Sequence, residues 1–291
     1  QLSQRSRRWA MSIPRFVLGH NALIGVHHVD REKDRLKPGL SQGDLEFLNF
    51  VAGSGVESVV LDNHPVAIEA AKFLSNESDI SVIPMIPYAQ SVVDKASSSG
   101  LYGVVKEMAS SLGPLFSTGH KSLRSLRHLS LTQIGAHLAT GKYLSDYPRK
   151  TLGNVCFLHN VVTDLMLGWE SGKGISSFAR AIRMSGLIPG FVTLNPQFID
   201  EIIQYVDGEV WFMTSVNSAG IQMGPDKEFV ERKILANPEI NILGMSLLGG
   251  GVLEPREEIP RALSFPAVKS IVIGTSSIRN LSELLEIVND S

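Results

Sequence analysis

The feature that most constrains the fold is a regular alternation of short apolar runs with amphipathic stretches, from Arg15 to the end of the chain. Each run is continuously apolar, which is typical of parallel strands covered on both faces. The stretches between them repeat apolar residues with the period of an α-helix. The predicted strands are 16–19, 56–61, 80–86, 155–158, 190–194, 210–215, 240–246 and 270–274.

Eight such units in a chain of this length predict an α/β fold, a closed (β/α)8 TIM barrel. An open doubly wound sheet is the rival, but no GxGxxG motif follows the first strand. Capping residues agree with the barrel, because Asp226 opens one helix and Asn280 or Ser282 opens the last. The interval between the third and fourth strands is unusually long. Within this interval we expect residues 91–112 to form the third barrel helix and residues of about 113–150 to form a helical insertion.

We expect residues 15–291 to form a single barrel domain. Residues 1–14 are basic and polar, and we interpret them as an arm that is disordered or vector-derived. The formal net charge of -2 gives no reason to expect a nucleic acid or a membrane as partner. The single cysteine, Cys156, excludes an intrachain disulfide and is expected to be buried. These features predict a cytoplasmic protein, or an imported organellar one if the basic arm is native. Assembly into a homo-oligomer is left open.

The carboxyl ends of the strands are where such barrels carry their chemistry. Five of the eight histidines follow strand ends, and Asp62 is the one carboxylate directly beside such an end. No lysine stands at a strand end, which excludes a Schiff-base aldolase with its nucleophile in the usual place. No pair of carboxylates is placed for a glycosidase. The five histidines are His20, His27, His28, His64 and His159.

Two loops have the composition of an anion site. Gly249, Gly250 and Gly251 follow the seventh strand, where glycines let backbone amides approach an anion closely. "GTSS" follows the eighth strand and precedes a helix, whose N-terminus attracts negative charge. Barrels commonly hold a phosphate at these two loops. The sequence therefore predicts an anionic or phosphate-bearing small-molecule ligand.

The same segments resemble the aldo-keto reductases. "MSLLGGGVL" is similar to the "SPLGxGxL" segment of that family, which wraps the pyrophosphate of a nicotinamide cofactor, and "IVIGTSSIRNLSELLE" is similar to its "IPGTxxxxxLxEN" segment. "VCFLHN" resembles "LxLIHxP", and "VVLDNH" resembles "FFDTA". The resemblance implies NADP or NAD as cofactor, with His159 and Asp62 as members of the catalytic tetrad. The cofactor contacts it implies are Ser246, Leu248, Gly250, Gly251, Gly274, Ser276 and Arg279, with Asn195 at the carboxamide.

The chain departs from the family pattern at the other two tetrad members. Ala67 stands where the family has its tyrosine acid, and Pro87 stands where it has a lysine. That lysine and the aspartate normally lower the pKa of the tyrosine, so that it can protonate a carbonyl. We expect an altered proton donor, with Tyr88 in this role and His64 and His159 beside it.

Two other functions stay open. Neutral imidazoles of His20, His64 and His159 with Asp62 could bind Zn²⁺ in a lyase, isomerase or hydrolase acting on a phosphorylated small molecule. The barrel could also be a noncatalytic protein that keeps an anion site. The first hypothesis remains an NAD(P)-linked oxidoreductase acting on a small carbonyl or alcohol.

Overall fold

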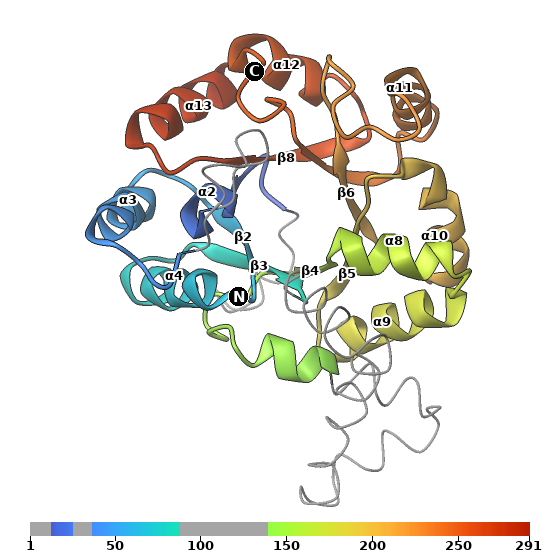
Figure 1. Cartoon of the computed structure of the whole chain (residues 1–291), viewed down its shortest axis with the longest axis horizontal. Coiled ribbons are helices and arrows are strands. Elements are labelled where there is room, and N and C mark those ends of the chain that lie inside the picture. The colour runs from blue at the N-terminus through green and yellow to red at the C-terminus, as the bar shows by residue number, and fades with distance from the viewer. Residues whose placement is uncertain (1–12, 26–36, 88–138) are drawn as a thin grey trace, which may run out of the picture.

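The computed structural model describes residues 13–25, 37–87 and 139–291, and it folds them into a closed barrel of eight parallel strands (Figure 1). Strands adjacent in the chain are adjacent in the barrel, and β8 closes on β1. The predicted (β/α)8 barrel is confirmed, and each predicted strand overlaps an observed one. The strands are β1 (Phe16–Gly19), β2 (Ser58–Asp62), β3 (Ser81–Ile86), β4 (Val155–Leu158), β5 (Ile188–Val192), β6 (Trp211–Ser215), β7 (Asn241–Met245) and β8 (Val268–Gly274).

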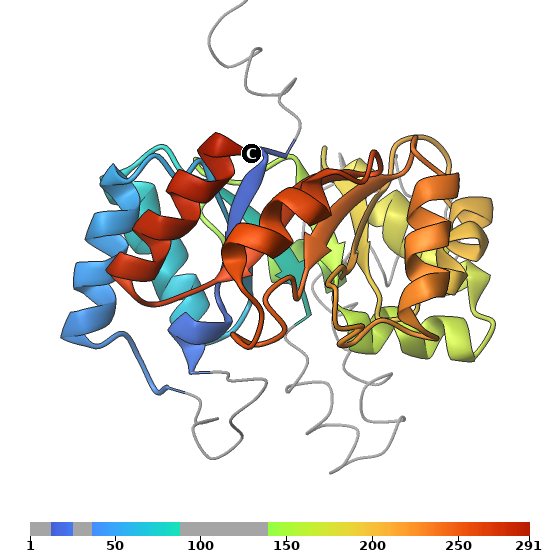
Figure 2. The ribbon, with the colours of Figure 1, turned by 90° about the horizontal axis from the view of Figure 1, so that it is seen from above.

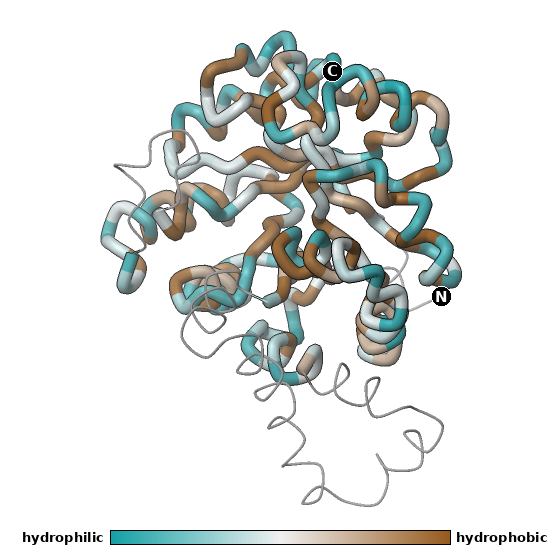
Figure 3. Tube along the Cα trace, turned by 45° about the vertical axis from the view of Figure 1, so that its right-hand side comes forward, coloured by the Kyte–Doolittle hydropathy of each residue, from teal (hydrophilic) through white to brown (hydrophobic). Residues whose placement is uncertain are grey.

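Helices surround the strands, and apolar segments of the trace concentrate toward the centre (Figure 3). In side view the helices flank the strands on both sides (Figure 2). The described helices are α2 (Asn21–Ile24), α3 (Gln42–Gly53), α4 (Pro65–Glu77), α8 (Asn160–Gly168), α9 (Gly172–Met184), α10 (Ile199–Tyr205), α11 (Lys227–Ala236), α12 (Pro255–Leu263) and α13 (Ile278–Asp290), with a 3₁₀ turn at Pro196–Phe198.

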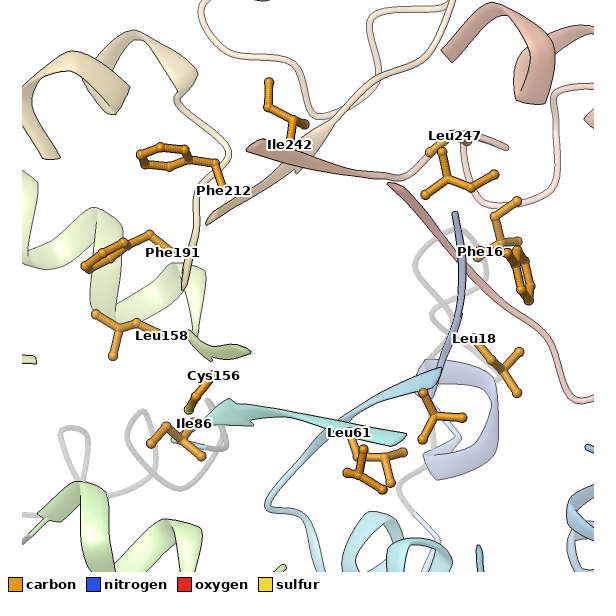
Figure 4. Close-up of a cluster of buried hydrophobic side chains, with 14 of the residues drawn as sticks. Phe16, Leu18, Leu61, Ile86, Cys156, Leu158, Phe191, Phe212, Ile242 and Leu247 are labelled. Carbon is orange, nitrogen blue, oxygen red and sulfur yellow. The ribbon is translucent and has the colours of Figure 1, made fainter. Parts of the chain in front are cut away.

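The apolar side chains of the strands form two separate clusters because successive residues of a strand face opposite ways. One set packs outward against the helices and includes Leu18, Leu61 and Phe212 (Figure 4). Cys156 belongs to this outer set and is fully buried, as predicted, and burial raises the pKa of its thiol. The other set fills the barrel interior and includes Val60, Phe157 and Met213. This alternation fixes which side chain at each strand end faces the interior.

Helix caps follow the sequence signals in one of the two predicted places. The Asp226 carboxylate accepts a hydrogen bond from the Phe229 amide at 2.7 Å and opens α11, as predicted. The prediction for the last helix is wrong, because α13 begins one turn earlier than Ser282. Ser277 is its cap, and its hydroxyl accepts from the Asn280 amide at 3.3 Å. Asn280 and Ser282 both lie within the helix.

Several predictions fall outside the described residues. They are the arm up to residue 12, His27, His28, Tyr88, the third barrel helix over 91–112 and most of the insertion over 113–150. Within the described part of that interval, residues 139–144 are helical, and Tyr147 packs into the outer cluster. In the segments that the structure describes, no helix has both the length and the apolar character needed to cross a bilayer.

Candidate active site

The carboxyl ends of the strands form one end of the barrel, called here the mouth. Asp62, His159 and Ser215 each lie two residues beyond an interior side chain, namely Val60, Phe157 and Met213. They therefore face the interior as well. Figure 2 shows α2 (blue) and α8 (yellow-green), which follow His20 and His159, at the same end of the barrel.

The strand register places these side chains at one level. Asp62 pairs with Met85 on β3, and Met85 pairs with Phe157 on β4. Strands in a closed eight-stranded barrel are tilted, so residues at the same height along the barrel axis are not register partners. With each step to the next strand, the residue at the same height lies about one position further along the chain than the register partner. His159 is therefore level with Asp62. Following the register partners Gly190 on β5 and Trp211 on β6 with the same shift places Ser215 at this height. Continuing through β7 to β8 places Gly274 there as well. We call these four residues, Asp62, His159, Ser215 and Gly274, the mouth layer.

Asp62 is the buried anion of this layer, with 3% of its surface exposed. Its Oδ1 accepts a hydrogen bond from the His64 amide at 2.9 Å, and its Oδ2 lies 3.1 Å from Nε2 of the buried His20. Burial pushes the pKa of Asp62 up, but the charge of His20 and the two contacts outweigh burial and hold it below its ordinary value. The sequence placed Asp62 in the site but did not predict that His20 would be its partner.

His64 and His159 have the same local structure. Each has an extended backbone, and each accepts the amide hydrogen two residues ahead on Nδ1 at 3.3 Å, which caps α4 and α8 respectively. A neutral imidazole that accepts on Nδ1 carries its proton on Nε2. The helix cap therefore selects the tautomer of His159 that presents a hydrogen-bond donor.

Burial lowers the pKa of His159 to about 4, although the charge of Asp62 opposes this and that of His20 adds to it. Burial also lowers the pKa of His64. At neutral pH, His159 is therefore a neutral donor suited to orienting an oxygen atom, and it holds no surplus proton to transfer. The charges of Asp62 and His20 both act on the pKa of His159, which indicates that the three side chains share one region of the mouth.

The two positions where the family has its tyrosine and lysine, Ala67 and Pro87, carry no side chain that can transfer a proton. Ala67 lies on α4, fully buried in the outer cluster. Pro87 directly follows β3 and has no ionisable group. Tyr147 is buried near this region, but its hydroxyl donates to the Leu61 carbonyl at 3.0 Å and burial raises its pKa well above its ordinary value. It is fixed in the outer layer and does not replace the missing tyrosine.

The glycine-rich turn after β7 is compact and partly self-bonded. Gly249, Gly250 and Gly251 all have positive φ, a conformation that glycine adopts without strain. The amides of Gly249 and Gly251 donate to the Ser246 and Leu248 carbonyls. Among the described residues, no hydrogen bond uses the amides of Leu248 and Gly250. Leu248 and Gly250 are both predicted cofactor contacts, and their backbone amides are therefore the hydrogen-bond donors that an anion could use here.

Ser246 is held by the loop after β6. Asn217 is fully buried, and its Nδ2 donates to the Ile221 carbonyl at 2.8 Å and to the Ser246 carbonyl at 3.2 Å. The Ser246 hydroxyl donates to Gln222 Oε1 at 2.9 Å, and both of these residues have positive φ. Asn217 therefore couples two mouth loops, a role that a strand-end asparagine in the sequence does not reveal.

The loop after β8 presents polar groups to solvent. Gly274, Ser276 and Arg279 are exposed, and Thr275 is buried. Gly274 pairs with Gly19 across the β8–β1 seam, so neither strand places a side chain at that part of the mouth. We call this part of the mouth, at Gly19 and Gly274, the glycine sector. The cofactor residues predicted after β7 and β8 border it, and the lack of side chains from β1 and β8 is compatible with a flat nicotinamide ring beside an anion site.

Asn195 is engaged within the protein. Its amide donates to Thr193 Oγ1 at 3.0 Å, and Thr193 Oγ1 donates to Asp164 Oδ1 at 2.6 Å. Burial raises the pKa of Asp164, against hydrogen bonds from Thr193, the Leu194 amide and the Asn195 side chain. A contact of Asn195 with a carboxamide stays a prediction.

The histidines proposed as metal ligands are not assembled into a metal site. His20 contacts Asp62, whereas His64 and His159 use Nδ1 to cap helices. Over residues 13–25, 37–87 and 139–291, no three or more His, Cys, Asp or Glu side chains are grouped to hold a metal ion.

Comparison with known proteins gives a structural likeness. No family model matches the sequence, and no curated protein matches it. A candidate aldo-keto reductase from Pseudomonas aeruginosa has a TM-score of 0.61 at 11% identity, covering 97% of this chain and 92% of that one. Aldo-keto reductase AKR11C1 from Bacillus halodurans has a TM-score of 0.55 at 12% identity, covering 95% and 87%. An aldo-keto reductase from a deep-sea metagenome library has 0.55 at 10%, covering 96% and 86%. The described part of the chain therefore shares the barrel fold of these aldo-keto reductases.

Proposed function

We propose that the protein is an NAD(P)-linked oxidoreductase that interconverts a small carbonyl compound and its alcohol with an altered proton donor. The observation that carries this proposal is the mouth layer. It sets Asp62 and the Nε2–H donor of His159 at one level, beside the glycine sector of β8 and β1. The fold likeness supports the same reaction class.

The residues present fit a dinucleotide. The free amides of Leu248 and Gly250 suit its pyrophosphate, and exposed Ser276 and Arg279 suit a further phosphate. A bound reduced nicotinamide would supply a hydride to the carbonyl carbon, and the carbonyl oxygen then needs one proton to become a hydroxyl.

His159 orients that oxygen through Nε2–H and, with a pKa of about 4, does not act as the acid at neutral pH. We assign the proton transfer to Tyr88, which follows β3 in the sequence. Asp62 supplies the buried negative charge beside His20. We keep the cytoplasm as the expected compartment, and in this proposal the dinucleotide is the anionic, phosphate-bearing ligand that the sequence predicts.

The first experiment measures cofactor binding from protein fluorescence. Trp211 lies in the barrel interior with 2% of its surface exposed, whereas Trp169 directly follows α8 and is 54% exposed. We expect NADPH or NADH to quench the fluorescence, and Arg279→Ala to weaken binding. Arg256→Ala is the matched control, because Arg256 is an exposed arginine on α12 whose closest acidic partner, Glu283, lies 3.7 Å away. Absence of quenching at millimolar cofactor would refute the proposal.

The second experiment tests the chemistry. Tyr88→Phe should reduce kcat while leaving cofactor affinity unchanged, and His159→Ala should reduce kcat/KM for carbonyl substrates. Absence of carbonyl reduction by the wild type, with a ligand affinity that His159→Ala leaves unchanged, would favour the noncatalytic barrel. Metal content of the protein, measured before any chelator treatment, distinguishes the metal-dependent alternative, which requires about one equivalent per chain.

A further inference from the structure

Ser215 is a buried polar residue of the mouth layer that the proposed reaction does not yet use. Its side chain has no exposed surface, and its hydroxyl has no hydrogen-bond partner among the described residues. Buried polar groups in native proteins are almost always paired, so a group of this kind requires an explanation.

The direction of the side chain distinguishes Ser215 from its neighbour. Thr214 is also buried and its hydroxyl also lacks a partner, but it alternates with Met213 and faces the helices. Ser215 faces the interior at the level of Asp62 and His159, and β6 is the next alternate strand after β4. The Ser215 hydroxyl is therefore directed toward the barrel interior at the same level as His159.

The surroundings of this hydroxyl limit what it could bind. The level beneath the mouth layer consists of interior residues from the odd-numbered strands, and those of β3, β5 and β7 are Met85, Val192 and Met245. Met245 is also the register partner of Ser215. This floor is apolar and uncharged. It suits a small neutral skeleton, whose polar atoms would be recognised by the layer above.

We propose that Ser215 recognises a second oxygen of the substrate, on the carbon next to the carbonyl that His159 orients. This inference rests on the proposed function and names its substrate class: small hydroxycarbonyl or dicarbonyl compounds. A serine hydroxyl both donates and accepts hydrogen bonds, so it serves either a hydroxyl or a carbonyl at this second position. The substrate oxygen completes the hydrogen bond that the protein leaves unmade.

The test compares two substrates that share a carbon skeleton. Acetoin has a hydroxyl next to its carbonyl, and butanone lacks it. With NADPH, the wild type should show the higher kcat/KM for acetoin. Ser215→Ala should lower kcat/KM for acetoin by about 3- to 10-fold, the range of one neutral hydrogen bond, and change that for butanone by less than about two-fold.

Two matched variants separate recognition from packing. Thr214→Val removes the neighbouring buried hydroxyl on the outward face and should leave both substrates unaffected. Ser215→Thr keeps a hydroxyl and should retain the preference for acetoin. Loss of activity with both substrates to the same extent in Ser215→Ala, or weaker NADPH binding with an unchanged acetoin-to-butanone ratio, would overturn the inference.

Failure of the proposed function gives a different result. If the wild type reduces no carbonyl compound, acetoin binding is measured by saturation-transfer NMR in wild type and Ser215→Ala without turnover. Weaker binding in the variant, with butanone binding unchanged, supports recognition by Ser215 even then. Equal binding of acetoin by the two proteins would overturn it.

Discussion

At the residue scale, the mouth combines side chains whose function depends on their burial. His159 caps α8 through Nδ1, and burial lowers its pKa to about 4. A strand-end histidine in a sequence shows neither fact, because both depend on the surrounding protein. The cap and the half-buried environment together make His159 a neutral donor with a defined tautomer, and this is the chemical property that the proposed reaction needs.

The lowered pKa of His159 predicts a pH dependence of stability. Since the ordinary pKa is 6.5 and the folded value is about 4, the unfolded chain binds more protons between these pH values. This stabilisation is present above pH 6.5 and is lost as the pH falls through about 4. We expect the free energy of unfolding, measured with urea, to fall by up to about 3 kcal/mol over this range because of this group.

His159→Asn is the matched variant, because its side-chain oxygen can still accept the Val161 amide and cap α8. The variant should lose stability less steeply between pH 6.5 and 4 than the wild type. His64 titrates in the same direction in both proteins and cancels in the comparison. Identical slopes would show that His159 is not buried as a neutral side chain.

The sequence predicted the residue types at the mouth better than their roles. Asp62 and His159 were predicted because each directly follows or ends an apolar run, and strand ends meet at one edge. Ser215 stands in an equivalent place, but its importance depends on the register that sets it level with the other two. His20 was expected as a metal ligand, yet its contact is with Asp62, since pairing across strands is not written in local sequence.

At the element scale, the strands were predictable because each is a continuous apolar run, whereas helix starts were predictable only where one capping residue stands alone. Asp226 is such a case. In "TSSIRNLSELL" several residues can cap, and Ser277 is selected because β8 ends at Gly274 and leaves a short connection. The end of β8 in the barrel therefore determines which of these residues caps α13.

This selection predicts different effects for two serines of the same segment. Ser277→Ala removes the hydroxyl that accepts the Asn280 amide and should lower the free energy of unfolding by about 1 kcal/mol. Ser282→Ala removes a hydroxyl that only donates back to the Ile278 carbonyl within the helix, so it should change stability by less than about 0.5 kcal/mol. Urea midpoints of both variants decide between the two cap positions, and a larger effect at Ser282 would contradict the observed helix start.

At the scale of the whole molecule, the barrel depends on an interior where large and small residues alternate. Gly190 on β5 pairs with Phe157 on β4, and the Phe157 ring occupies the space beside the glycine. Filling this interior fixes how closely β4 and β5 approach. His159 of the mouth layer lies only two residues beyond Phe157, so the geometry of that layer depends on this packing.

Gly190→Ala tests this dependence. A Cβ at this position would lie 2.5 Å from the Phe157 ring, in a closed interior where the ring has little room to move. We expect the free energy of unfolding to fall by about 1–3 kcal/mol through overpacking. Gly168→Ala is the control, because a Cβ there meets nothing within 4 Å at the last residue of α8, and the better helix former should be neutral or slightly stabilising. If Gly190→Ala were as stable as this control, the interior would be looser than the register implies, and the level that joins Asp62, His159 and Ser215 would not be fixed by packing.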